Sequence, residues 1–242
     1  MKKNKLRLYS QLLFLSATIL IFIFLGNSKT HLICPNNVNC VLFSNLHSSY
    51  FFLSIGFILS ILVLIITAFF GRYFCSYVCP IGAIQDFIGF KAKMKHPKFL
   101  FFLKYIILFS IIIGSYFSGK IIYQNVCPVE FLAGKIPYYN LGFTILSIIT
   151  LISIFWKRFF CTTFCPYAAL MNITQWLMLK ISQGKFPKSL SPSKCVHCGI
   201  CKSHCSLDIE VDSKNPFDIV ECIRCGECLD SCPIQKKNKR NS

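Results

Sequence analysis

Eight of the fifteen cysteines lie near the C-terminus, in two runs that share the spacing C-x-x-C-x-x-C-x-x-x-C. The first run is Cys195, Cys198, Cys201 and Cys205, and the second is Cys222, Cys225, Cys228 and Cys232, followed by Pro233. Three thiolates at such gaps hold one [4Fe–4S] cluster, and the fourth cysteine of each run ligates the other cluster. The spacing therefore predicts one cluster on Cys195, Cys198, Cys201 and Cys232, and a second on Cys222, Cys225, Cys228 and Cys205.

Zinc is the alternative occupant of a segment so rich in cysteine. Zinc sites pair C-x-x-C units, whereas here a group of three cysteines plus one is duplicated in register, which favours clusters. Gly199 and Gly226 stand at matched positions after the second cysteine of each run, where a tight turn favours glycine. Ser206 stands where such runs usually have proline, but proline is not a ligand, so the prediction is unchanged.

Two further cysteine pairs have the form C-x-x-x-C-P, namely Cys75 and Cys79 before Pro80, and Cys161 and Cys165 before Pro166. Cysteines four residues apart at a helix end point to the same side, and the proline suits the first position of a new helix. The four thiols are therefore a candidate third redox or metal site. The alternative is that they are buried free thiols that pack like small apolar residues. Iron content separates the two, since about eight atoms per chain would mean two clusters only.

The remaining cysteines are Cys34, Cys40 and Cys127. They fall in segments that the charge pattern below places outside the cytoplasm, where a disulfide is permitted. A disulfide or free thiols are favoured there over a cofactor. Clusters and free thiols need a reducing compartment, so the C-terminal segment is expected in the cytoplasm.

The elements that must position these thiols are apolar. Hydrophobic residues make up 54% of the 242 residues and charged residues only 14%, compared with roughly a quarter charged in soluble proteins. Four apolar runs, at 6–26, 51–70, 99–118 and 141–156, approach the ~20 residues that a helix needs to cross a bilayer. The sequence predicts four transmembrane helices. A cleaved signal peptide is the alternative for the first run, but residues 26–28 match a cleavage site poorly.

The formal net charge of +17 has a topological interpretation. Lysine and arginine gather in residues 1–10, 71–104 and from 157 onward, and are sparse in 27–50 and 119–140. Basic residues favour the cytoplasmic side, which predicts a multi-pass protein of the bacterial inner membrane with both termini in the cytoplasm. No basic helix with interleaved aromatic residues is present, which argues against a nucleic-acid partner.

The chain contains an internal duplication. Residues 72–80 parallel residues 157–166, and each segment follows an apolar run and precedes an amphipathic stretch. Two units of the same orientation constitute a parallel repeat. The expected fold is therefore an all-α membrane domain at 1–182, with four transmembrane helices in two parallel two-helix repeats. An α+β two-cluster ferredoxin-like domain with a basic tail is expected at 183–242.

The segment from Cys75 to Ala83, with the sequence CSYVCPIGA, the second C-x-x-x-C-P motif and the C-terminal runs resemble the membrane polyferredoxins of the NapH and NosR type. The resemblance extends from Cys34 to Pro233. It implies an inner-membrane electron-transfer subunit of a quinol dehydrogenase, which passes electrons from the quinol pool, with menaquinol as a substrate, to a soluble or periplasmic redox partner. It also implies that the eight C-terminal cysteines are cluster ligands and that both C-x-x-x-C-P pairs are required.

Two other functions stay open. The segment from Cys161 to Ala168, with the sequence CTTFCPYA, is similar to assembly proteins of the CcoG type. That similarity implies a metal-handling factor for a respiratory metalloenzyme, in which the thiols of Cys75, Cys79, Cys161 and Cys165 handle copper. The other alternative is a structural anchor for a soluble redox partner, which would recruit that partner even without clusters.

Overall fold

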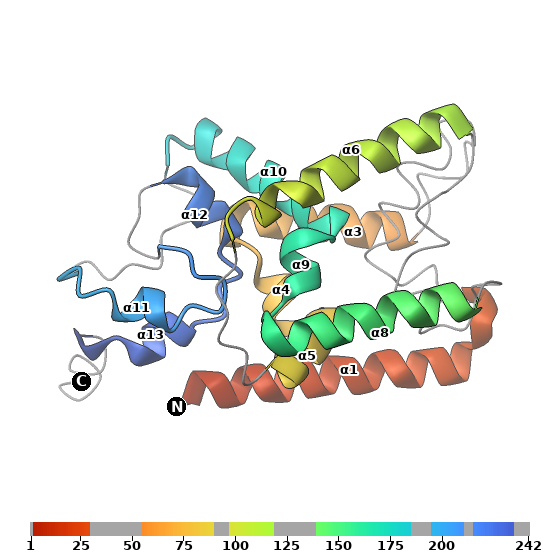
Figure 1. Cartoon of the computed structure of the whole chain (residues 1–242), viewed down its shortest axis with the longest axis horizontal. Coiled ribbons are helices and arrows are strands. Elements are labelled where there is room, and N and C mark those ends of the chain that lie inside the picture. Colours follow the sequence, from red (N-terminus) through yellow and green to blue (C-terminus); the bar gives the residue numbers. More distant parts are fainter. Residues whose placement is uncertain are drawn as a thin grey trace.

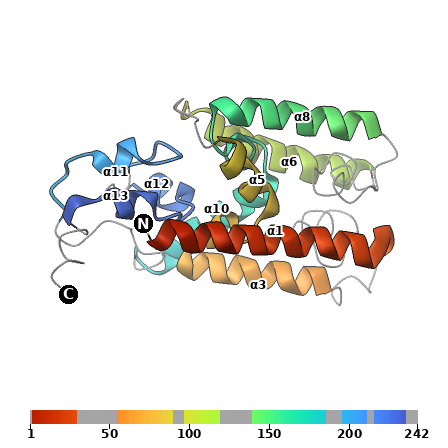
Figure 2. The same cartoon turned by 90° about the horizontal axis from the view of Figure 1, so that it is seen from below.

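The computed structural model describes residues 2–29, 55–89, 97–118, 139–184, 195–210 and 215–234, in which every regular element is a helix. Four long helices form the body: α1 (Lys2–Lys29), α3 (Ile55–Phe70), α6 (Leu100–Ser118) and α8 (Tyr139–Phe155). They extend along the long axis of the molecule, and the C-terminal segment lies at one end of them, beside the N-terminus (Figures 1 and 2).

Four further helices lie among these: the short α4 (Tyr73–Tyr77), α5 (Pro80–Ile88) and α9 (Phe159–Thr163), and α10 (Pro166–Ile181), which is as long as α3. Helix α10 packs against α3 and α6, and α5 packs against α1 and α8. Helix α4 contacts α1 and α3, while α9 contacts α6 and α8. Helices α4, α5, α9 and α10 therefore connect α1, α3, α6 and α8, and both C-x-x-x-C-P motifs lie where these helices meet (Figure 1).

The two repeats have the same local structure. Cys79 and Cys165 are the N-cap residues of α5 and α10 and have extended backbone conformations, with ψ angles of 119° and 108°. Pro80 and Pro166 occupy the first turn of these helices, as expected, since proline lacks the N–H that would go unpaired there. Each motif therefore ends one short helix and starts the next at its second cysteine.

The C-terminal segment contains three short helices, α11 (Ile200–Ser203), α12 (Pro216–Glu221) and α13 (Glu227–Ser231). Gly199 and Gly226 have φ angles of 73° and 82°, a left-handed conformation that favours glycine and agrees with the tight turns predicted there. His197 and Arg224, just before the second cysteine of each run, also have positive φ angles. Helix α11 packs against α13, and α12 packs against α10, so the two cysteine runs are side by side and attached to the body.

The predicted fold class is wrong in two respects. Among the described residues, none of the helices combines the length and the apolar character needed to cross a membrane. Helices α3 and α8, for example, have 16 and 17 residues, fewer than the ~20 that a bilayer requires. The predicted α+β domain is also wrong, because the described part of the C-terminal segment contains helices and no strand. Its tight turns at the cysteines leave only four to six residues for each helix.

Several sequence-based predictions lie outside the described residues. Cys34, Cys40 and Cys127 are among them, as are most of the two segments expected on the outer side, 27–50 and 119–140. Most of the linker at 183–193 and the tail at 236–242 also lie outside. The predicted disulfide or free thiols on the outer side and the domain boundary near residue 183 stay predictions.

Candidate iron–sulfur site

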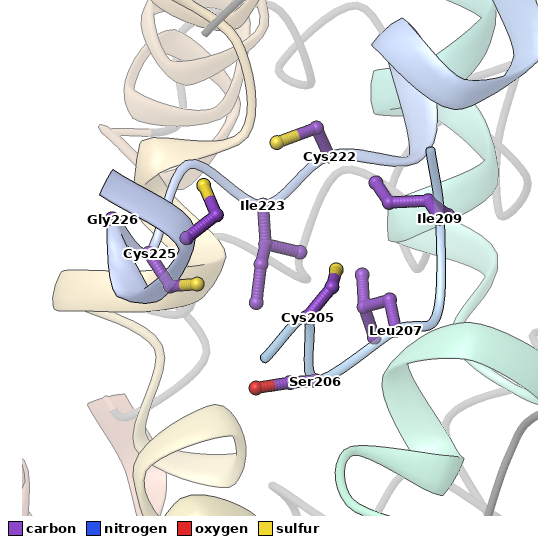
Figure 3. Close-up of a pocket in the computed structure, with 9 residues that line it drawn as sticks. Cys205, Ser206, Leu207, Ile209, Cys222, Ile223, Cys225 and Gly226 are labelled. Atoms are coloured by element: carbon purple, nitrogen blue, oxygen red, sulfur yellow. The ribbon is translucent and has the colours of Figure 1, made fainter. Parts of the chain in front are cut away.

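Four cysteines of the C-terminal segment line one cavity, together with Leu207, Ile209 and Ile223. They are the set that the spacing assigns to the second cluster: Cys205, Cys222, Cys225 and Cys228. In Figure 3, Cys205 lies on one segment, Cys222 and Cys225 lie on another, and Ile223 projects between them. The structure thus brings together thiols from both runs, as the exchange of the fourth ligand requires.

The cavity suits an iron–sulfur cluster in its chemistry. Burial raises the pKa of the Cys225 thiol to about 11 and that of the Cys205 and Cys228 thiols to about 12. Buried thiolates are therefore costly here unless positive charge compensates them, which bound iron supplies. All twelve cysteines in the described ranges are free thiols. In those ranges, no three cysteine, histidine or carboxylate side chains lie close enough together to hold a single metal ion.

The four cysteines assigned to the first cluster are less enclosed. Cys198 is exposed, while Cys195, Cys201 and Cys232 are half-buried. Helix α11 carries Cys201 and packs against α13, which ends one residue before Cys232. The packing brings the two runs close to each other, and the ligand set itself stays a prediction.

A buried ion network fixes the residue before Cys222. The Glu221 carboxylate is fully buried and accepts hydrogen bonds from Lys104 at 2.6 Å, from Arg72 at 3.0 Å and from the Asn172 amide at 2.7 Å. Burial lowers the pKa of Lys104 to about 8, although Glu221 opposes the shift. The network joins α6, α10 and the residue preceding α4 to the end of α12, and so holds the second cysteine run against the body.

A second ion network holds Glu227, the residue before Cys228. Glu227 accepts hydrogen bonds from Arg7 at 2.8 Å and from Lys157 at 2.9 Å, and also one from Ser206. Arg7 also forms an ion pair with Asp86, whose carboxylate accepts a hydrogen bond from Arg158 Nε at 2.7 Å. The two arginines hold the pKa of the Asp86 carboxyl well below its usual range, despite its burial. Both carboxylates that precede ligand cysteines in the second run are therefore paired with cations of the body.

The Glu227 pairing should make stability depend on pH. Although burial opposes it, Lys157, Ser206 and Arg7 lower the pKa of Glu227 from 4.5 to about 2. A lowered folded-state pKa contributes stability above the unfolded-state value, and this contribution is lost as pH falls from about 4.5 to about 2. We expect Glu227→Gln to lower the urea unfolding midpoint at pH 7 and to lower it much less at pH 3. If Glu227→Gln lowered the urea unfolding midpoint equally at both pH values, the ion pairing of Glu227 would not be the source of the effect.

The two C-x-x-x-C-P pairs lie in the centre of the body. Cys75 in α4 and Cys161 in α9 are buried, at 7% and 4% exposure, and Cys79 and Cys165 at the following helix starts are half-buried. Gly82, in the first turn of α5, lies against the backbone of Cys75. A Cβ atom at Gly82 would be 2.6 Å from the Cys75 carbonyl oxygen, which also accepts a hydrogen bond from Arg158 at 2.8 Å.

Gly82→Ala should therefore destabilise the protein, because α4 and α5 must move apart at the first cysteine pair. Overpacking of this kind costs about 1–3 kcal/mol, measurable as a decrease in the free energy of unfolding in urea. Ser203→Ala is the control, since Ser203 is exposed and the substitution adds no atom to the packing. An equal effect of both substitutions would argue against the close approach at Cys75.

Sequence reasoning missed the ion networks. Arg72 and Arg158 stand three residues before the first cysteine of each pair, and this repeated spacing was the available signal. Lys104 inside an apolar run was a second signal, because a buried lysine needs a partner. Glu221 and Glu227 each directly precede a cysteine, but no local sequence pattern indicates which lysine or arginine pairs with them.

The fold and the site define the class: a helical protein with a cysteine-lined cavity suited to an iron–sulfur cluster. A family model described as a 4Fe-4S binding domain matches residues 52–98 and 141–189, each of which contains one C-x-x-x-C-P pair. The chain belongs to the family of iron–sulfur electron-transfer proteins of the ferredoxin type that includes NapH and NosR.

Individual relatives agree with this family. An uncharacterized protein of Methanocaldococcus jannaschii is 30% identical over 191 residues, which cover 71% of this chain and 73% of the relative. The putative electron transport protein YccM of Escherichia coli is 28% identical, over 78% of this chain and 55% of its own. The ferredoxin-type protein NapH of Escherichia coli is 25% identical, over 66% and 59%. No solved structure matches the chain significantly.

Proposed function

We propose that this protein relays electrons between the quinol pool and a redox partner protein in a respiratory chain, through two clusters bound by the C-terminal cysteines. The observation that carries the proposal is the shared cavity of Cys205, Cys222, Cys225 and Cys228. Iron–sulfur clusters, when bound, accept and donate single electrons. The protein's own residues bind the irons, exclude water and set the surrounding charge.

The charge around the second cluster site supports a redox role. Glu221 is paired with two cations, and Asp86 and Glu227 together are paired with three, so each network has one surplus positive charge. Arg7 and Arg158 both interact electrostatically with the Cys225 thiol. Positive charge near a cluster with four thiolates favours its reduced, more negative state. The networks are therefore suited to raising the reduction potential of the second cluster.

We also propose that the protein acts at the cytoplasmic membrane, with its C-terminal segment in the reducing cytoplasm. Exposed apolar side chains support this location. They include Leu62, Ile65 and Phe70 on α3 and Phe102, Ile106 and Phe109 on α6. Apolar surfaces of this extent mark lipid or protein contacts. Recovery of the protein in the soluble fraction of cell lysates would contradict this location.

The test of the relay is anaerobic purification followed by EPR spectroscopy and addition of a menaquinol analogue. We expect the quinol to reduce the clusters, and a Cys225→Ser variant to lose the signal of the second cluster. Clusters that are present but unchanged by quinol would refute the quinol-linked relay. Copper binding together with a lack of reduction by quinol would favour the metal-handling function.

A further inference from the structure

The thiols of the two C-x-x-x-C-P pairs converge in the middle of the body. The Cys161 and Cys165 thiols each interact electrostatically with both thiols of the first pair. Cys75 and Cys165 contact one apolar cluster, and Cys79 and Cys165 contact another. Four thiols that are 86 residues apart in the two repeats are thus gathered where α4, α5, α9 and α10 meet.

Backbone N–H groups surround the second thiol of each pair, although burial raises the pKa of the Cys79 thiol to about 11 and that of the Cys165 thiol to about 12. Cys79 accepts backbone hydrogen bonds from Gly82 and Ile81, and Cys165 accepts one from Ala168, so each lies at a helix N-terminus. Helix N-termini stabilise negative charge. Each repeat therefore presents the second thiol of its pair to backbone donors in the same way.

Two fully buried arginines supply positive charge to the same place. Arg72 interacts with Cys75, Cys161 and Cys165, and Arg158 interacts with Cys79 and Cys161. Arg158 also donates a hydrogen bond to the Cys75 carbonyl oxygen at 2.8 Å, which links the second repeat to the first pair. A centre with four thiolates is negatively charged, and the two guanidinium groups are positioned to compensate it.

A buried hydroxyl and a buried thioether lie beside the first pair. The Ser76 hydroxyl, between the two cysteines of the first pair, is fully buried and has no hydrogen-bond partner among the described residues. The Met171 sulfur lies 3.6 Å from the Cys75 sulfur. A buried polar group without a partner is costly in a finished core, and the soft sulfur of methionine suits the neighbourhood of a soft metal centre.

We propose that Cys75, Cys79, Cys161 and Cys165 together bind a third [4Fe–4S] cluster across the interface of the two repeats. Its place beside the C-terminal site is favourable for electron exchange, because Cys75 and Cys165 pack in the same apolar cluster as Cys205, Cys222 and Cys225. This proposal does not depend on which molecule donates the electrons. It also gives the internal duplication a function, since each repeat supplies two of the four ligands.

The test is the iron and sulfide content of the anaerobically purified full chain, combined with EPR and Mössbauer spectroscopy. The wild type should contain about twelve iron atoms, at four per cluster. Cys161→Ser should reduce this to about eight and leave the signals of the C-terminal clusters intact. Thr162→Ser is the matched control, because it changes the adjacent buried residue and keeps the hydroxyl that bonds to the Arg158 carbonyl.

Three results would overturn the proposal: a wild type with about eight iron atoms, a Cys161→Ser variant that still has about twelve, or copper in place of iron at the pairs. If Cys161→Ser does not accumulate, Cys79→Ser repeats the test at a half-buried position, and the wild-type count remains decisive. A lack of reduction by quinol would leave this iron count unchanged. The quinol-linked relay and the third cluster can therefore be refuted independently.

Discussion

Glu221→Ala should lower the free energy of unfolding by about 3–5 kcal/mol, the cost of leaving buried charge without its partner. The substitution removes the only carboxylate that the described structure pairs with Arg72 and Lys104, both of which have no exposed surface. Because Glu221 directly precedes Cys222, the second cysteine run should also detach from the body. Urea unfolding of the reduced protein, with EPR of the second cluster, measures both effects.

The charge origin of this effect can be isolated with a double-mutant cycle. Lys104→Met removes one of the two uncompensated cations, so the double variant Glu221→Ala/Lys104→Met should be more stable than Glu221→Ala alone. Glu210→Ala is the control, since Glu210 and Lys202 form an exposed pair at 2.7 Å that should contribute nothing measurable. A Glu221→Ala variant as stable as Glu210→Ala would disprove the structural role of the network.

Cys225→Ser should remove the second C-terminal cluster, with a loss of about four iron atoms per chain. Serine cannot replace a thiolate in this soft ligand set. Cys225 lines the cavity and also interacts electrostatically with Arg7 and Glu227, so no neighbouring thiol is expected to substitute for it. Iron analysis and EPR before and after dithionite reduction provide the measurement.

The control for this experiment is Ser203→Ala, an exposed change in the same segment. The Ser203 hydroxyl contacts only the Ile200 carbonyl oxygen and His204 Nδ1 among the described residues. That variant should keep its full iron content. Retention of all the iron by Cys225→Ser would show that the second set of four ligands is assigned wrongly. Loss of all the iron would instead show that the two C-terminal clusters assemble as one unit.

The sequence predicted the local features of the site because they depend on short spacings. The positions of Gly199 and Gly226 predicted tight turns, and both glycines have the positive φ angles that glycine accommodates in such turns. The prolines after Cys79 and Cys165 predicted helix starts, and α5 and α10 begin there. Each of these predictions needs only the few residues around a cysteine, so chain periodicity and backbone sterics suffice.

The same reasoning failed for the fold class, where composition alone was a poor guide. The apolar runs do form helices α1, α3, α6 and α8, but the prediction that they cross a membrane is not supported by the described residues. Hydropathy shows that a helix avoids water, but it does not show whether lipid or other helices surround that helix. The amphipathic stretches that follow the two cysteine pairs form α5 and α10, but their hydropathy does not show which helices they pack against.

The amino-acid sequence by itself determined which residues carry the chemistry: two cysteine runs in register and two C-x-x-x-C-P pairs. Only the tertiary structure decided how charge surrounds them. The ion pairs join Arg7 to Glu227, Lys104 to Glu221 and Arg158 to Asp86, over separations of 220, 117 and 72 residues. Cluster ligation follows from spacing within a loop, whereas charge compensation in a buried site depends on which distant segments pack together, and no local pattern encodes that choice.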